Sequence, residues 1–130
     1  MGGLTSVTLR EWTLILPMAT PMSLNHRDNH WVRADKVKTV RDATHVLALQ
    51  AKIPRCNKVA VTLIYTPRDG RRRDPLNLVP TLKACEDGLV DAKVVPDDTP
   101  QWLESRMPLI DAPDGSVGVA RLVLLVEQMA

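Results

Sequence analysis

The sequence predicts a small α/β (α+β) domain in which two main helices pack on a mixed β-sheet. Three observations lead to this prediction. The 130 residues, 45% of them apolar, suffice for one compact core, so we expect a single domain over residues 1–130. Two segments repeat apolar residues at steps of three and four, as amphipathic helices do. Four other segments are rich in β-branched and apolar residues, as strands are.

The elements are expected in the order β-α-β-α-β-β. Residues 6–16 form the first strand, which Pro17 ends, and the polar stretch that follows, including Trp31, is a loop. A helix begins near Asp35 and ends near Pro54. Residues 58–65 then alternate with two apolar faces, which is typical of a central strand.

The second half of the chain continues the pattern. Residues 67–73 form a turn-rich basic loop, and residues 78–92 form the second helix. Residues 102–110 and 117–128 are expected to be strands, joined by a turn at Asp114 and Gly115. The sequence shows no internal repeat and no domain linker.

Charge is distributed unevenly along the chain, although the net charge is only +2. Residues 27–73 hold twelve Lys or Arg against four Asp or Glu, a net +8, whereas residues 74–130 hold four against ten, a net −6. A basic half beside an acidic half suits a protein that holds a polyanion next to metal-binding carboxylates. Two ordinary solvated faces explain the same charges, and charge alone favours that interpretation.

Other features exclude several classes of protein. The longest apolar runs fall far short of the roughly 20 residues that cross a bilayer, and the first residues lack the pattern of a signal peptide, so we expect a cytoplasmic protein with no membrane partner. Cys56 and Cys85 form no CxxC pair and are expected to be free, buried thiols.

Trp31 lies among basic residues, where a ring can stack on a base, but covering the edge of the core is the commoner role.

The residues that suggest chemistry lie between the basic loop and an acidic corner. In residues 71–74 three arginines run directly into an aspartate, and Asp97 and Asp98 follow one helix later, between prolines. Carboxylates from separate elements can bridge Mg²⁺, while arginines and Lys83 hold a phosphate. Each piece alone has a plainer interpretation: a solvated loop, a helix cap, a polar turn, and an ordinary helix pair between Lys83 and Asp87.

Taken together and in order, these pieces resemble the RusA-type Holliday junction resolvases, small homodimeric Mg²⁺-dependent endonucleases of bacteria and their prophages. The matching segments are RRRDPLNL at residues 71–78, Lys83, DGLVDA at residues 87–92 and VPDD at residues 95–98. The resemblance extends more weakly over most of the chain, and its ordered motif is quite specific. It implies a homodimer, branched double-stranded DNA as partner, and Mg²⁺ as cofactor, with Mn²⁺ as a substitute.

The resemblance also implies roles for residues at matching positions. The expected catalytic residues are the first and last metal-binding aspartates and the phosphate-contacting lysine: Asp74, Asp98 and Lys83. The expected metal ligands, which include a substitute from the second helix, are Asp74, Asp97, Asp98 and Asp87. The expected contacts to DNA come from the basic half and from the asparagine of the motif: Arg33, Lys36, Lys38, Arg41, Arg71, Arg72, Arg73 and Asn77.

One position departs from the family's Asp-x-Asp-Asn pattern, because Leu76 stands where the second aspartate is expected. Leucine cannot ligate Mg²⁺, so the site loses one of three expected carboxylates. Three explanations remain open. In the first, Asp87 supplies the missing ligand. In the second, the protein binds junctions but cuts them slowly or not at all. In the third, Leu76 is a natural or engineered substitution that has removed the function.

The leading hypothesis is a crossover junction endodeoxyribonuclease, of weak activity because of Leu76, whose two sites nick opposite strands of a four-way junction in a bacterial or phage-infected cell. The alternative is a non-catalytic protein that binds branched DNA with the same fold. A third hypothesis is a small structural or assembly protein whose acidic and basic residues form ion pairs.

Overall fold

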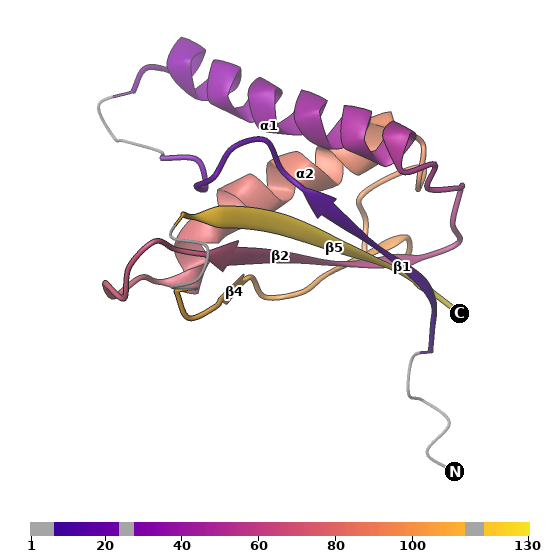
Figure 1. Ribbon diagram of the computed structural model, residues 1–130. Helices are drawn as coiled ribbons and strands as arrows, with labels where there is room; N and C mark the ends of the chain where they lie inside the picture. The colour runs from indigo at the N-terminus through magenta and orange to yellow at the C-terminus, as the bar shows by residue number, and fades with distance from the viewer. Residues whose placement is uncertain (1–6, 24–27, 114–118) are drawn as a thin grey trace.

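The computed structural model describes residues 7–23, 28–113 and 119–130 (Figure 1). This part of the chain forms a mixed sheet, two helices and a short 3-10 helix that directly precedes the second helix. In order, the elements are β1 (Thr8–Ile15), α1 (His30–Gln50), β2 (Val59–Thr66), η1 (Pro75–Leu78), α2 (Val79–Asp91), β3 (Leu103–Ser105), β4 (Leu109–Ile110) and β5 (Arg121–Met129). The prediction of a mixed sheet with two main helices is confirmed.

The sheet is built around β2. Its strand order is β1-β5-β2-β3, and β4 also pairs with β2. β5 runs antiparallel to both β1 and β2, whereas β3 and β4 run parallel to β2. All residues of β2 except Ile64 are buried. The prediction of a central strand, made from its two apolar faces, is therefore confirmed.

The strand expected over residues 102–110 is instead two short strands. β3 pairs with the first half of β2 and β4 with the second half. Pro108 lies between them and has no N–H to donate, which explains why one continuous ladder does not form. The turn expected at Asp114 and Gly115 lies outside the described residues. Because β2 separates β3 and β4 from β5, these last strands of the chain are not neighbours.

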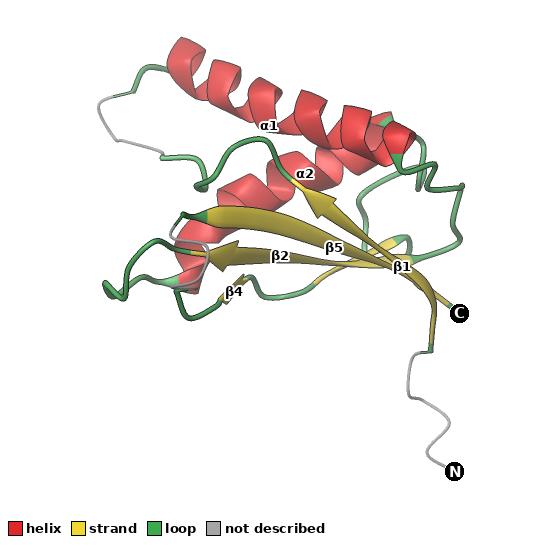
Figure 2. Ribbon diagram, viewed as in Figure 1, coloured by secondary structure: helices red, strands yellow, loops and turns green. Residues whose placement is uncertain are grey.

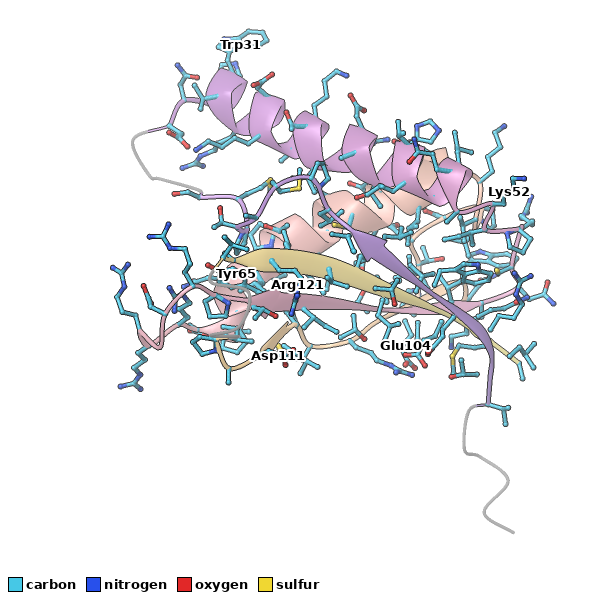
Figure 3. All side chains as sticks on the ribbon, in the orientation of Figure 1. Trp31, Lys52, Tyr65, Glu104, Asp111 and Arg121 are labelled. Atoms are coloured by element: carbon cyan, nitrogen blue, oxygen red, sulfur yellow. The ribbon has the colours of Figure 1, made fainter. Side chains whose placement is uncertain are left out.

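Helix α1 begins at His30, earlier than the expected start near Asp35. Its N-cap is Asn29, whose side chain accepts a hydrogen bond from the backbone N–H of Val32 at 3.0 Å. Trp31 therefore lies in the first helical turn, and its ring is 73% exposed and points away from the protein (Figure 3). The expectations that Trp31 lies in a loop and covers the edge of the core are both wrong.

Both helices cover the same face of the sheet (Figure 2). They approach closely at Gly88 of α2, where an added Cβ would lie 2.5 Å from the Arg41 carbonyl oxygen and 2.8 Å from the Thr44 Cβ. Cys56 and Cys85 are free and buried, as predicted, and burial raises the pKa of Cys85 to about 12. The largest fully buried side chains of the core include Leu63, Leu89, Leu122, Leu124 and Val126.

The helix expected over residues 78–92 is α2, which follows η1 directly. Pro75 opens η1 and Pro80 lies in the first turn of α2, where the missing proline N–H removes no hydrogen bond of the helix. None of the helices in the described part of the chain is long and apolar enough to cross a membrane.

Candidate phosphate and metal site

The basic loop of residues 67–73 folds around its own aspartate. Asp69 accepts hydrogen bonds from the backbone N–H of Arg71 at 3.1 Å and from the guanidinium groups of Arg71 and Arg73. The bonds from Arg71, more than that from Arg73, hold the pKa of Asp69 well below its usual range. Among the described residues Arg72 has no hydrogen-bond or ion-pair partner, so its guanidinium is available to an anion.

A pocket of about 780 Å³ opens beside this loop, near the end of β2. The Arg73 guanidinium carbon lies 5.7 Å from the centroid of the Tyr65 ring, within range of a cation–π contact. Two guanidinium groups and an amide around one hollow suit a phosphate group, because planar guanidinium donors match phosphate oxygens. The pocket is lined by Pro21, Tyr65, Arg72, Arg73, Asp74, Pro75, Asn77 and Leu78.

Asp74 is the N-cap of η1. Its Oδ1 accepts a hydrogen bond from the backbone N–H of Leu76 at 3.0 Å, and Pro75 follows in the first turn. The plainer interpretation of Asp74, a cap ahead of a proline, is therefore confirmed. Its Oδ2 makes no hydrogen bond to the described residues, and Asp74 lines the pocket.

Leu76 is 57% exposed and lines a second hollow, of about 400 Å³, together with Met22, Ser23, Asn77 and Pro80. Asn77 borders this hollow and the pocket of Asp74 alike. A carboxylate placed at residue 76 would meet solvent rather than the core, so it would carry little desolvation cost.

A second group of predicted site residues meets on α2. The Lys83 ammonium forms an ion pair with Asp87 one turn further along the helix, at 3.1 Å, and another with Asp98 of the corner at residues 96–100. Asp97 orders this corner, because its Oδ1 accepts the backbone N–H of Asp98 at 2.8 Å. The fold thus brings together Lys83, Asp87 and Asp98, which the sequence separates.

The four predicted metal ligands are divided between these two places. Asp74 faces the arginine pocket, whereas Asp87 and Asp98 both bind Lys83. Over residues 7–23, 28–113 and 119–130, no three His, Cys, Asp or Glu side chains are grouped so that they could hold a metal ion. Metal binding by these aspartates stays a prediction, and a cation shared by Asp87 and Asp98 would have to displace the Lys83 ammonium.

Three of the cations expected on α1 to contact DNA are engaged with carboxylates. Lys36 pairs with Asp28 at 2.6 Å, and Lys38 pairs with Asp42 on the next helical turn. Arg41 donates two hydrogen bonds, of 2.6 and 2.7 Å, to Asp91 of α2, and these bonds lower the pKa of Asp91. Arg33 is exposed in the first turns of the helix. Excess positive charge is therefore concentrated in the loop at residues 67–73, where four arginines face one aspartate.

One site residue was not predicted from the sequence. Glu86 of α2 is only 5% exposed, and its carboxylate accepts a hydrogen bond from the Ser105 hydroxyl of β3. Burial raises its pKa, an effect that the Ser105 hydrogen bond and the nearby Lys83 partly oppose. The signal was present, because Glu86 lies four residues after Leu82 and three before Leu89, on the apolar side of the helix.

Comparison of the chain with protein-family models gives no match, and comparison with curated proteins gives none either. The assignment of a function therefore depends on the residues and the geometry described above.

Proposed function

We propose that this chain is a Mg²⁺-dependent endonuclease that resolves four-way (Holliday) junctions by paired nicks, as a homodimer, in the cytoplasm of a bacterial or phage-infected cell. The observation that carries the proposal is the contact of Lys83 with Asp98, residues fifteen positions apart in the motif. The expected phosphate-contacting lysine and the expected last metal-binding aspartate are thereby side by side. The pocket of Arg72, Arg73 and Asp74 supplies the remaining parts.

Phosphate binding is the function that the charges support most directly. Arg72 has no partner among the described residues, and Asn77 adds an amide donor to the same pocket. Contacts of this kind read the charge and shape of DNA rather than its bases. Preference for a branched substrate therefore has to come from the placement of two such pockets in a dimer.

The side-chain chemistry suits Mg²⁺, because Asp74, Asp97, Asp98 and Asp87 offer carboxylate oxygens, which this ion prefers. In the described residues these carboxylates are divided between two places and Lys83 is paired with Asp87 and Asp98, so binding at these two requires the ion to replace the ammonium. When bound, Mg²⁺ supplies an activated water and neutralises charge on the phosphate. The protein's own part is to hold the phosphate at Arg72, while the Lys83 ammonium, released from Asp98 when an ion binds there, would be free to stabilise negative charge on the scissile group.

A second candidate is a non-catalytic protein that binds branched DNA. Two observations favour it: Leu76 replaces an expected carboxylate, and Lys83 neutralises Asp87 and Asp98. Such a protein would keep the arginine pocket and the dimer without turnover. Metal binding distinguishes it from the first candidate.

DNA binding is tested by measuring the affinity for a labelled four-way junction and for a linear duplex at several salt concentrations. The slope of log K against log salt is negative, and each lost phosphate contact reduces its steepness by about 0.9. Arg72→Gln is expected to reduce the steepness of the slope by about that amount. Arg55→Gln, an exposed arginine before the start of β2, is the control and should leave it unchanged. Equal slopes in both variants would show that the pocket does not hold phosphate.

Metal binding is tested by calorimetric titration with Mg²⁺ and Mn²⁺. The endonuclease proposal predicts binding that is weakened in Asp98→Asn and in Asp74→Asn, and unchanged in Asp42→Asn, an exposed acid of α1. Tight junction binding without any metal binding would contradict the endonuclease and support the second candidate.

A further inference from the structure

Tyr65 is held in place by strands on both sides. It lies near the end of β2, where it pairs with Ile110 of β4 and with Leu122 of β5. Side chains alternate along a strand, so its ring shares the helix-covered face of the sheet with Val61 and Leu63, which are fully buried. Figure 3 shows Tyr65 at the end of the sheet where the basic loop of residues 67–73 begins. The core therefore fixes the position of this ring.

The ring of Tyr65 is buried, but its hydroxyl has no protein partner. The residue is only 7% exposed. In the part of the chain that the structure describes, the hydroxyl makes no hydrogen bond, and no side-chain oxygen or nitrogen there is both sealed from solvent and without a partner. The hydroxyl is therefore open to solvent. Since Tyr65 lines the pocket beside the basic loop, this hydroxyl is a donor that a ligand in the pocket can use.

Arg73 places a positive charge next to this hydroxyl. Its guanidinium carbon lies 5.7 Å from the centroid of the Tyr65 ring. The guanidinium is itself bound by the Asp69 carboxylate at 2.9 Å, by the Asp69 carbonyl oxygen at 2.8 Å and by the Arg71 carbonyl oxygen at 2.9 Å. Most of its donors are thus committed to the loop. Arg73 therefore contributes charge at a fixed place more than it contributes hydrogen bonds to a ligand.

The rest of the pocket suits a phosphate that belongs to a larger molecule. Its lining holds two guanidinium groups and one carboxylate, that of Asp74, which gives a net charge of +1. Arg72 and Asn77 are exposed donors in this lining. The volume, about 780 Å³, lies within the range of about 300–1,000 Å³ that is usual for ligand sites, so the pocket can admit a nucleotide-sized part of a strand.

We propose that the Tyr65 hydroxyl donates a hydrogen bond to a phosphodiester oxygen of the nucleic-acid strand whose phosphate Arg72 holds. The two donors have different tasks. Arg72 attracts the phosphate by its charge, whereas Tyr65 offers a neutral donor at a fixed position and so sets where the phosphate lies. A neutral donor releases no counterion from the DNA, so the contribution of Tyr65 to affinity does not depend on salt.

This inference deepens the proposed function, since it rests on that function for nucleic acid as the ligand. It makes no use of metal or of cleavage. The plainer role of Tyr65 is packing in the core, and Tyr65→Phe separates the two roles. Phenylalanine keeps the ring, its burial and its contact with Arg73, and it lacks only the oxygen.

The first test is the affinity of the whole chain for a labelled four-way junction, measured at several salt concentrations with chelator so that no strand is cut. Tyr65→Phe is expected to raise the dissociation constant about tenfold and to leave the steepness of log K against log salt unchanged. Arg72→Gln is expected to reduce both the affinity and the steepness. Thr13→Val, which removes an exposed hydroxyl of β1 outside the pocket, is the control and should bind as the wild type does.

The second test uses the wild type and needs no folded variant at residue 65. The chain contains a single tyrosine, so a ¹³C label on the ring carbon that bears the hydroxyl gives one NMR signal, from Tyr65. Titration with inorganic phosphate should shift this signal to saturation, whereas sodium chloride at the same ionic strength should not. In Arg72→Gln the shift should need more phosphate. Circular dichroism checks that each variant is folded.

The inference is overturned if the signal of Tyr65 does not respond to phosphate, or if a folded Tyr65→Phe binds the junction as tightly as Thr13→Val. A loss of steepness in Tyr65→Phe would also overturn it, because the effect would then come from a displaced charge. Cleavage of junctions by a protein with an unresponsive Tyr65 would leave the proposed function standing. Conversely, a saturable response to phosphate in a protein that does not bind or cut junctions counts against the proposed function alone.

Discussion

Replacing Gly88 by alanine is expected to destabilise the protein, because the two helices meet at this residue. The added Cβ would lie 2.5 Å from the Arg41 carbonyl oxygen, 2.8 Å from the Thr44 Cβ and 3.1 Å from the His45 backbone nitrogen. Two of these three atoms are backbone atoms and the other is a branched Cβ, so none can rotate away. The helices would have to separate.

The size of the effect follows from two opposing terms. Overpacking in a close-packed core costs about 1–3 kcal/mol, and contacts to rigid atoms favour the upper end. Alanine offsets about 1 kcal/mol of this through its higher helix propensity. The free energy of unfolding of Gly88→Ala should therefore fall by about 2 kcal/mol, which corresponds to a decrease of about 8 °C in Tm for a domain of this size.

The assay is urea unfolding followed by circular dichroism at one pH, with Gly70→Ala as the matched control. No atom lies within 4 Å of a Cβ built on Gly70, so this variant should be neutral or more stable by a few tenths of a kcal/mol, since alanine restricts the unfolded chain. If Gly88→Ala proves as stable as Gly70→Ala, the close approach of α1 and α2 described here does not exist in solution.

Two further predictions concern ionisable groups and use the same unfolding assay as a function of pH. Burial raises the pKa of Glu86 above its ordinary 4.5, so the folded state binds this proton more tightly; stability should fall as the pH rises from about 4.5 through the raised value. Glu86→Gln should lack that fall, and an unchanged pH profile would contradict the burial. Arg41→Gln should cost about 1 kcal/mol or less at neutral pH, since the pair with Asp91 is partly exposed. Because Arg41 lowers the pKa of Asp91, the difference should disappear as the pH falls below 3.8; a difference that persists in acid would rule out the pair as its source.

Much of the fold follows from local sequence patterns. The alternation of residues 58–65 identified the central strand, observed at Val59–Thr66, and the three- and four-residue steps identified both helices, because burial on one side imposes these periods. The start of α1 was missed because its first turn is largely exposed and has no periodic signal; only the cap, Asn29, marks it. Strand pairing is set by distant residues, so the parallel addition of β3 and β4 to β2 could not be read from the sequence.

The candidate site was predictable in its parts and not in its arrangement. The motif identified Lys83 and Asp98 together, and the structure places them in contact. The motif gave no sign that Lys36, Lys38 and Arg41 have carboxylate partners, since two of these partners lie outside α1: Asp28 before the helix and Asp91 in α2. Whether a side chain is free to bind DNA depends on such tertiary contacts, which charge counts along the chain do not contain.

The endonuclease proposal is tested by cleavage of a labelled four-way junction by the wild type and by Leu76→Asp, each with Mg²⁺ and with chelator. Leu76 is exposed beside Asn77, so the new carboxylate can reach a bound ion without disturbing the core. We expect Mg²⁺-dependent paired nicks that are at least about tenfold faster in Leu76→Asp. Equally rapid, Mg²⁺-dependent cutting by both proteins would contradict the assignment of the site.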